Sequence, residues 1–179
     1  DLHSPYQNVS VKFNNDQLKP ITVQSNNIWL QTPIDLSNEI NQKKNAGWHK
    51  FYIIPFTSTN YDFKDILIVG SGTGNDVATA IRYSKGNIDA VEIDPTAAKC
   101  AKENFENSSW DYKLTLYNEP LQDYTNIDVI LYEYIVCNPP YFEPSPTTRP
   151  DRINARTTVT LDHETLIHYA DKLLGANGT

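Results

Sequence analysis

The apolar and polar positions follow two different patterns along the chain. Residues 6–31 hold three short strand-like stretches separated by Asn-rich turns, which is typical of a small antiparallel sheet. Residues 34–46 are predicted to form a short polar helix before Gly47. The short apolar stretch Phe51–Phe56 follows them. From Asp65 onward, apolar runs of strand length alternate with segments of helical periodicity. We therefore expect an N-terminal β-rich region over residues 1–60 and a second unit over residues 61–179.

The second unit is predicted to have an α/β fold. The run Ile66–Val69 has no polar position, as expected of a strand buried on both faces, and Pro95 suits the first turn of a helix. The predicted strands span residues 66–69, 88–93, 113–117 and 127–136, and the predicted helices span residues 75–84, 95–105 and 161–174. Because strands that alternate with helices form a mostly parallel sheet, we expect such a sheet with helices on both faces.

Two features of this second unit are irregular. Residues 127–136 contain two strand-like phrases back to back, which exceeds the usual strand length of about five or six residues. This predicts a junction or a long bent strand near Tyr132. The residues Gly175–Thr179 stand where the next parallel strand is expected, so we expect the C-terminal strands of the core to be missing.

Charge and composition limit the classes of partner. The chain has a net charge of -7 and a pI near 5.0, which argues against a large nucleic-acid footprint, since phosphate-binding surfaces are usually basic. It has no basic-then-apolar leader and no apolar run near the roughly 18 residues that cross a bilayer, so we expect a cytoplasmic protein without a membrane partner. Cys100 and Cys137 lack metal-ligand spacing, and we expect buried thiols and no metal.

A glycine-rich turn follows the first buried strand directly. Gly70, Gly72 and Gly74 form a G-x-G-x-G turn, and Asn75 stands where a dinucleotide fingerprint needs its next glycine. A pyrophosphate cradle is therefore disfavoured. Glu92 ends the second strand, where a carboxylate can accept the hydroxyl protons of a ribose. This order favours a nucleoside cofactor, and the alternative is a tight turn with a solvated acid at the end of a strand.

The fourth predicted strand ends in Asn138-Pro139-Pro140-Tyr141. The side-chain oxygen of Asn138 and the carbonyl of Pro139 can accept the two protons of a conjugated amino group, which directs its lone pair at an electrophile. The second proline makes the turn rigid, and Tyr141 can stack on a planar base. The motif therefore favours methylation of an amino group, and the alternative is a simple turn that closes a strand.

Residues 65–105 resemble class I S-adenosylmethionine-dependent methyltransferases and the related polyamine synthases. The resemblance implies a Rossmann-type core with strand order 3-2-1-4. His3–Gln7 and Gly70–Asp76 are most similar to the spermidine-synthase group. The resemblance implies S-adenosylmethionine as cofactor, with the glycines against its methionine part, Glu92 on its ribose and Glu119 or Asp123 near its adenine. The cofactor residues implied by the resemblance are Gly70, Ser71, Gly72, Thr73, Gly74, Glu92, Ile93 and Glu119.

The second half of the chain resembles the bacterial tRNA (adenine-N6) methyltransferases that modify a valine tRNA. The similar segments are Ile88–Trp110, Asn138–Ser145, Arg149–Arg156 and Leu161–Leu166. The resemblance implies methyl transfer to adenine N6 of tRNA, without a metal. Arg149, Arg152 and Arg156 then form either a phosphate-contacting loop or a solvated loop beside a helix.

Roughly the first half of the chain resembles the polyamine-synthase group, and the second half resembles the tRNA methyltransferases. The sequence therefore reads as a composite, or chimera, of the two. A spermidine-synthase-like aminopropyltransferase is one alternative function, although Asn138 stands where that reaction needs an Asp. A catalytically silent cofactor-binding scaffold is the other alternative.

Overall fold

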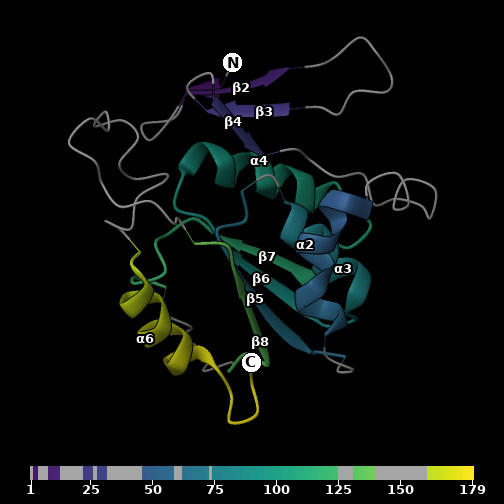
Figure 1. The fold of residues 1–179 in the computed structure, drawn as a ribbon, viewed down its shortest axis with the longest axis vertical. Coiled ribbons are helices and arrows are strands. Elements are labelled where there is room, and N and C mark those ends of the chain that lie inside the picture. Colours follow the sequence, from purple (N-terminus) through teal and green to yellow (C-terminus); the bar gives the residue numbers. More distant parts are fainter. Residues whose placement is uncertain are drawn as a thin grey trace.

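The computed structural model describes residues 2–3, 8–12, 22–25, 28–31, 46–58, 62–72, 74–124, 131–139 and 161–179. Two separate four-stranded sheets are present (Figure 1). The N-terminal sheet consists of β1 (Leu2–His3), β2 (Asn8–Lys12), β3 (Thr22–Ser25) and β4 (Ile28–Gln31), paired in that order. All three pairs of neighbouring strands are antiparallel, so the small N-terminal β region predicted from the sequence is confirmed.

The second sheet is parallel and lies at the centre of the fold. Its strands are β5 (Asp65–Val69), β6 (Asn87–Val91), β7 (Leu114–Tyr117) and β8 (Tyr134–Cys137). They pair in the order β7-β6-β5-β8, and every pair is parallel. The predicted Rossmann-type core and its strand order are confirmed.

Helices surround this parallel sheet. They are α2 (Ala46–Thr57), α3 (Asn75–Tyr83), α4 (Pro95–Glu106) and α6 (His163–Leu173), with a short 3-10 turn at Asp111–Lys113. The predicted helices over residues 75–84, 95–105 and 161–174 match α3, α4 and α6 to within two residues at each end. None of the helices within the described ranges is long and apolar enough to cross a membrane.

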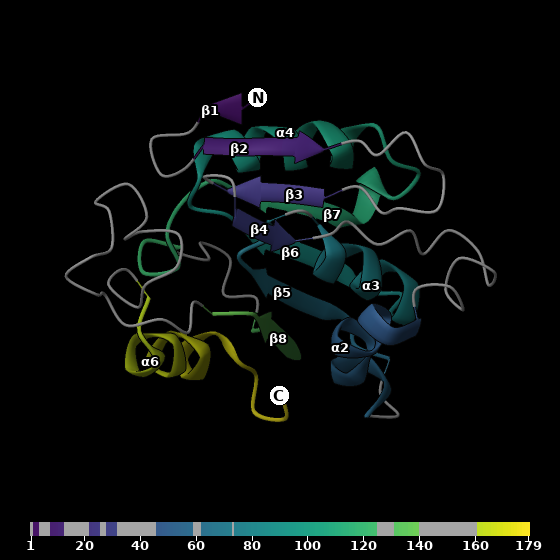
Figure 2. The ribbon, with the colours of Figure 1, turned by 45° about the horizontal axis from the view of Figure 1, so that its top comes forward.

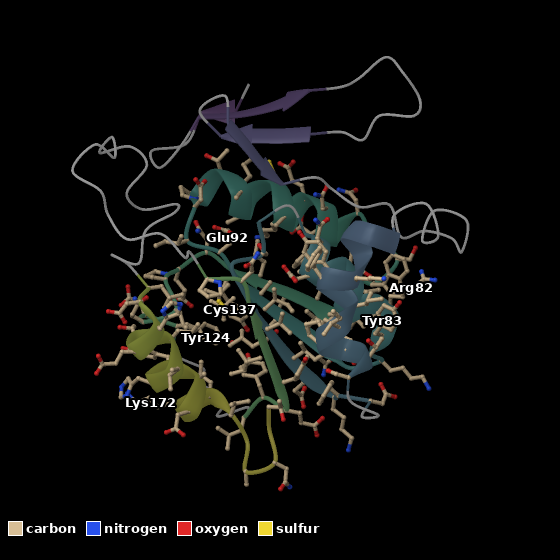
Figure 3. All side chains as sticks on the ribbon, viewed as in Figure 1. Arg82, Tyr83, Glu92, Tyr124, Cys137 and Lys172 are labelled. Carbon is tan, nitrogen blue, oxygen red and sulfur yellow. The ribbon has the colours of Figure 1, made fainter. Side chains whose placement is uncertain are left out.

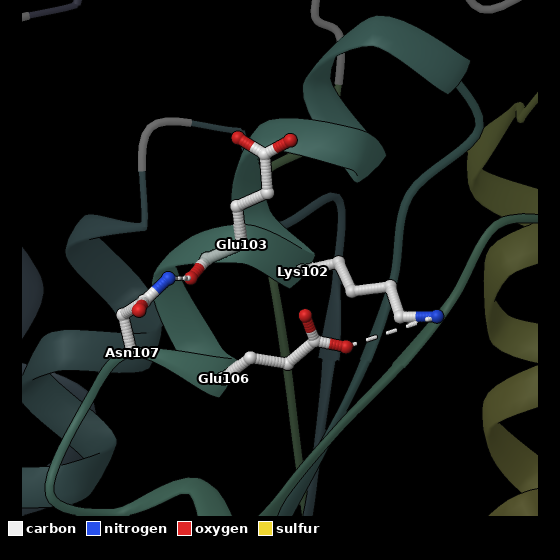
Figure 4. Close-up of polar contacts among 4 residues, drawn as sticks. All are labelled: Lys102, Glu103, Glu106 and Asn107. Carbon is white, nitrogen blue, oxygen red and sulfur yellow. Dashed lines mark hydrogen bonds and ion pairs between the residues drawn. The ribbon is translucent and has the colours of Figure 1, made fainter.

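Helix α4 is closed by local hydrogen bonds at both ends. The Asp94 side chain accepts hydrogen bonds from the main-chain amides of Thr96 at 2.8 Å and Ala97 at 3.1 Å, an N-cap that Pro95 at the first position complements. At the other end, the Asn107 side-chain amide donates to the Glu103 carbonyl at 2.7 Å (Figure 4). The N-cap fixes where α4 begins, and the C-terminal bond fixes where it ends. The start of α4 is close to the end of β6, since only Glu92 and Ile93 stand between β6 and Asp94.

Side chains alternate between the two faces of the sheet and form two cores. One core combines Ile66, Ile68, Ile88, Ala90, Tyr134 and Val136 of the strands with Phe56, Phe63, Val77, Ala80 and Phe105. The other combines Leu67, Val69 and Val91 with Leu121, Tyr124, Tyr132 and Leu173. Helices α2, α3 and α4 therefore cover one face, and α6 contributes to the other. Figure 2 shows α6 on the opposite side of the strands from α2 and α3.

The apolar stretch Phe51–Phe56 lies within helix α2. Phe56 packs edge-on against Tyr134 with ring centroids 5.4 Å apart, and Phe63 stacks on the same ring at 4.2 Å. The Tyr134 hydroxyl donates to the carbonyl of Pro55. Helix α2 is thus part of the Rossmann core. The division at residue 60 remains a proposal, and this packing favours a boundary before residue 46. The helix predicted for residues 34–46 lies almost entirely outside the described residues.

The fourth strand is shorter than the segment predicted over residues 127–136. Strand β8 covers only Tyr134–Cys137, and residues 125–130 lie outside the described part of the chain. Tyr132 instead pairs with Leu174 in a single parallel bridge, and its amide donates to the Leu173 carbonyl at 2.8 Å. The next amide, that of Glu133, donates to the Asp65 carbonyl of β5 at 2.9 Å. The C-terminal segment also stays bonded after Tyr132, since the Thr179 amide donates to the Glu133 carbonyl and the Ile135 amide donates to the Thr179 carbonyl, both at 3.0 Å. The main chain here therefore lies between β5 on one side and the residues after α6 on the other.

Candidate active site

The register of the parallel sheet brings the predicted site residues to one edge. Cys137 pairs with Val69, Val69 with Val91, and Val91 with Tyr117. The residues that directly follow this row, from β8 to β7, are Asn138, Gly70, Glu92 and Asn118. Neighbouring strands are about 4.8 Å apart, so segments up to 68 residues apart in sequence (70 to 138) meet at the carboxyl ends of the strands. This edge is the usual ligand-binding edge of an open α/β sheet.

The glycine loop requires backbone conformations that other residues rarely adopt. Gly70, Gly72 and Gly74 have φ values of 80°, 48° and 84°. The loop is held by a hydrogen bond from the Gly70 amide to the Val91 carbonyl at 2.8 Å and by one from the Gly74 amide to the Ser71 carbonyl at 2.8 Å. Apart from its immediate chain neighbours, a Cβ built on Gly70 or Gly74 would meet no atom of the described residues within 4 Å. The glycines therefore allow the turn and leave open space in front of it.

Glu92 connects the glycine loop to the start of α4. Its Oε2 accepts a hydrogen bond from the Gly72 amide at 2.9 Å, and its Oε1 accepts one from the Asp94 amide at 2.9 Å. The residue is only 8% exposed, and burial raises the pKa of its carboxyl group while the amide hydrogen bonds oppose that shift. An ionised carboxylate has about four acceptor positions, so both oxygens keep capacity for a ligand.

Asn118 is a site residue that the sequence did not single out. Its side-chain amide donates to the Glu92 carbonyl at 2.7 Å and to the Ile93 carbonyl at 3.4 Å. It thus fixes the main chain of the acid-bearing loop from the neighbouring strand. A polar residue directly after the third strand was the available signal. Ile93 and Glu119 are both half-buried in this region.

Two more polar groups lie in or beside the glycine loop. The Ser71 side chain is 2% exposed, and its Oγ has no hydrogen-bond partner among the described residues. Asp76 is half-buried in the first turn of α3, and burial raises the pKa of its carboxyl group to about 6. The charge of Asp76 contributes, after burial, to raising the pKa of the Cys137 thiol to about 12. Figure 3 shows Cys137 and Glu92 in the same central region, far from Arg82 and Tyr83.

The motif after β8 is described only in part. Asn138 is exposed and Pro139 is half-buried, directly beyond the end of the strand. The remaining predicted site residues, Thr73, Pro140, Tyr141, Arg149, Arg152 and Arg156, lie outside the described residues. Among the residues whose positions are given, no cluster of His, Cys, Asp and Glu is suited to hold a metal ion.

Comparison with known proteins places these features in context. The family model described as "Methyltransferase small domain" matches residues 53–178. The tRNA1(Val) (adenine(37)-N6)-methyltransferase of Salmonella enteritidis is 36% identical over 120 residues, which cover 65% of this chain and 49% of that protein. The corresponding Salmonella typhimurium protein has the same identity and coverage. The chain thus spans about half the length of the curated relatives it matches.

A solved structure supports the fold independently. A crystal structure of spermidine synthase in complex with the transition-state analogue AdoDATO matches with a TM-score of 0.58 at 15% identity, over 96% of this chain and 52% of that one. At this identity the likeness concerns the fold alone. The methyltransferase resemblance inferred from the sequence is confirmed by the family match, which includes the glycine loop, Glu92 and Asn138. This chain belongs to the methyltransferase small domain family.

Proposed function

We propose that this protein is an S-adenosylmethionine-dependent N-methyltransferase that acts on adenine N6 in tRNA. The observation that carries the proposal is the hydrogen bond from the Gly72 amide to Glu92, beside open space at Gly70 and Gly74. The register of the sheet brings this loop and Asn138 to the same edge. The relatives named as tRNA1(Val) (adenine(37)-N6)-methyltransferases support the choice of substrate.

The residues of the loop fit the proposed cofactor. S-adenosylmethionine supplies a methyl group on a positively charged sulfur, which makes that methyl group electrophilic. The open space in front of Gly70 and Gly74 leaves room for the methionine part, with Ser71 and Thr73 in the same loop. The two amide hydrogen bonds orient the Glu92 carboxylate, whose remaining lone pairs accept the ribose hydroxyl protons. Ile93 directly follows Glu92, and Glu119 lies two residues beyond the end of β7; both are proposed to contact the nucleoside.

Asn138 is proposed to prepare the amino group for attack. The lone pair of the adenine amino group is delocalised into the ring, so the group is a poor nucleophile. The side-chain oxygen of Asn138 and the Pro139 carbonyl accept hydrogen bonds from its two N–H groups, which directs the lone pair towards the methyl group and stabilises the positive charge that develops. As the N–C bond forms, the bond between the methyl group and sulfur breaks, and the methylated nitrogen then loses one proton to water. Pro140 keeps this turn rigid, and Tyr141 stacks on the base.

The tRNA contact is proposed to be local. The net charge of -7 is unfavourable for a broad phosphate-binding surface. Arg149, Arg152 and Arg156 form the basic group nearest in sequence to the Asn138 motif, and we propose that they contact phosphates beside the target base.

Aminopropyl transfer is the second candidate, and the resemblance of Gly70–Asp76 to the spermidine-synthase group favours it. That reaction requires a base to accept a proton from the attacking amine. Asn138 has a neutral side-chain amide, which cannot act as that base. We therefore rank this activity below N-methyl transfer.

A transfer assay tests the proposal. Valine tRNA transcripts that carry adenine or guanine at position 37 are incubated with the protein and methyl-labelled S-adenosylmethionine, and the digested nucleosides are analysed. We expect labelled N6-methyladenosine from the adenine transcript only. A parallel reaction contains decarboxylated cofactor and putrescine. An aminopropyl product there, without methyl transfer, would replace the proposal with the second candidate.

A further inference from the structure

Asp76 has an unusual environment for an acid at the start of a helix. An acid in the first helical turn normally has a lowered pKa, because the N-terminal amides and the helix dipole stabilise its negative charge. Here burial outweighs that effect and raises the pKa of the Asp76 carboxyl to about 6. Only its own main-chain amide opposes the shift, and no cationic side chain among the described residues contributes. A half-buried carboxylate without a cation is costly to the free protein.

Asp76 is also close to the proposed chemistry. It is two residues beyond Gly74, and its charge reaches the Cys137 thiol, which directly precedes Asn138. The loop on the other side of Gly74 contains the buried Ser71 hydroxyl, which has no hydrogen-bond partner in the part of the chain that the structure describes. Gly70 directly precedes Ser71, and Gly74 lies two residues before Asp76. Both glycines face open space. Within the described residues, a half-buried carboxylate without a cation and a buried hydroxyl without a partner therefore flank Gly74 in the sequence. A cationic group that donates hydrogen bonds would satisfy both.

We infer that the Asp76 carboxylate binds the α-ammonium group of the methionine part of S-adenosylmethionine. The inference rests on the proposed function. It adds Asp76 to the cofactor site, beside the glycine turn and the ribose contact proposed for Glu92. A charge-assisted hydrogen bond between an ammonium group and a carboxylate satisfies both partners in a partly buried site.

The ammonium group is a better partner for Asp76 than the sulfonium group. The sulfonium charge disappears as the methyl group leaves, so a carboxylate in contact with it would stabilise the ground state more than the transition state. Such a contact would slow the transfer. The ammonium charge does not change during the reaction, and its contact with Asp76 adds affinity without raising the barrier.

Calorimetric titration of the Asp76→Asn variant tests the inference. The three ligands are S-adenosylmethionine, S-adenosylhomocysteine, which keeps the ammonium but has a neutral sulfur, and methylthioadenosine, which has no amino-acid part. We expect the variant to bind the first two about 10-fold more weakly and methylthioadenosine as tightly as the wild type does. Asp171→Asn, on the exposed surface of α6, is the matched control and should bind all three like the wild type.

The same titrations provide a pH-dependent signal. Binding of a cation favours the ionised form of Asp76, so the wild type should release a proton on binding near pH 6, and the variant should not. Cys137 is the titratable group whose pKa responds to Asp76, and its own pKa near 12 keeps it protonated in this range. Thermal unfolding and circular dichroism show whether the variant is folded.

The outcomes separate this inference from the proposed function. Weaker binding of S-adenosylmethionine alone would place Asp76 on the sulfonium and overturn the assignment to the ammonium group. Unchanged binding of all three ligands by a folded variant would also overturn it, while the cofactor site itself would stand. A wild-type protein that binds none of the three ligands would remove the proposed cofactor and this inference with it.

Discussion

The main-chain amide of Gly72 donates a hydrogen bond to Oε2 of Glu92 at 2.9 Å. This contact joins the loop after β5 to the end of β6, and the second oxygen of the same carboxylate accepts the amide of Asp94 at 2.9 Å. Asp94 in turn caps α4 through Thr96 and Ala97. One carboxylate therefore sets the position of the glycine loop relative to the start of the next helix.

Replacement of Glu92 by Ala should weaken cofactor binding strongly. It removes the proposed acceptor of the ribose hydroxyls and leaves the buried Asp94 amide without its partner, which costs about 1–3 kcal/mol, and the more exposed Gly72 amide without its partner as well. We expect roughly 10- to 100-fold weaker binding of S-adenosylmethionine by calorimetry, since charged hydrogen bonds contribute about 1.5–3 kcal/mol. The exposed Glu103 of α4, changed to Gln, is the control. Equal affinity in wild type and Glu92→Ala would show that the ribose contact is misplaced.

Replacement of Asn138 by Ala should abolish transfer and leave cofactor affinity unchanged. The side-chain oxygen is proposed to act only on the substrate amino group, and loss of a comparable preorganised group lowers turnover by about 100- to 1,000-fold. Single-turnover assays on valine tRNA measure the rate, and titration with S-adenosylmethionine measures the affinity. Turnover at the wild-type rate would rule out the proposed acceptor role.

Asp76→Asn should stabilise the free protein in a pH-dependent way. The pKa of the Asp76 carboxyl is 3.8 in the unfolded chain and about 6 in the folded protein. Between these pH values the folded protein therefore binds more protons than the unfolded chain. Wild-type stability should therefore fall as pH rises from about 4 to 6 and then remain level. The ionised carboxylate costs at most about 3 kcal/mol, so the variant should be more stable by about 1–3 kcal/mol at pH 8 and equal to the wild type near pH 3.5. Urea unfolding at several pH values measures this, and a constant difference across the range would contradict the prediction.

Charge reversal at Arg152 should weaken tRNA binding and reduce its salt dependence. If Arg152 contacts a phosphate, its loss lowers the number of released counterions by about one, and the slope of the logarithmic salt plot decreases by about the same amount. Binding of labelled tRNA at several salt concentrations measures both effects. Lys99→Glu on α4 makes the same charge change at an exposed position. The same effect in both variants would indicate a general charge effect instead of a contact by Arg152.

The sequence predicted the core well where local patterns decide the structure. The apolar run of β5, the glycine turn and Pro95 each specify their own conformation, and the parallel sheet follows from the alternation of strands and helices. Helix α2 was harder because Phe51–Phe56 has strand-forming residues, and its helical structure depends on packing against Phe63 and Tyr134. The role of Asn118 follows from the register of β6 and β7, and the burial of Asp76 follows from packing between distant segments. Neither is encoded in a short motif.

The central claim is that the glycine loop and Glu92 hold intact S-adenosylmethionine for methyl transfer. Calorimetric titration of the purified chain with S-adenosylmethionine and, separately, with its decarboxylated form tests it most directly. We expect tighter binding of the intact cofactor. Tighter binding of the decarboxylated form, or binding of neither, would contradict it.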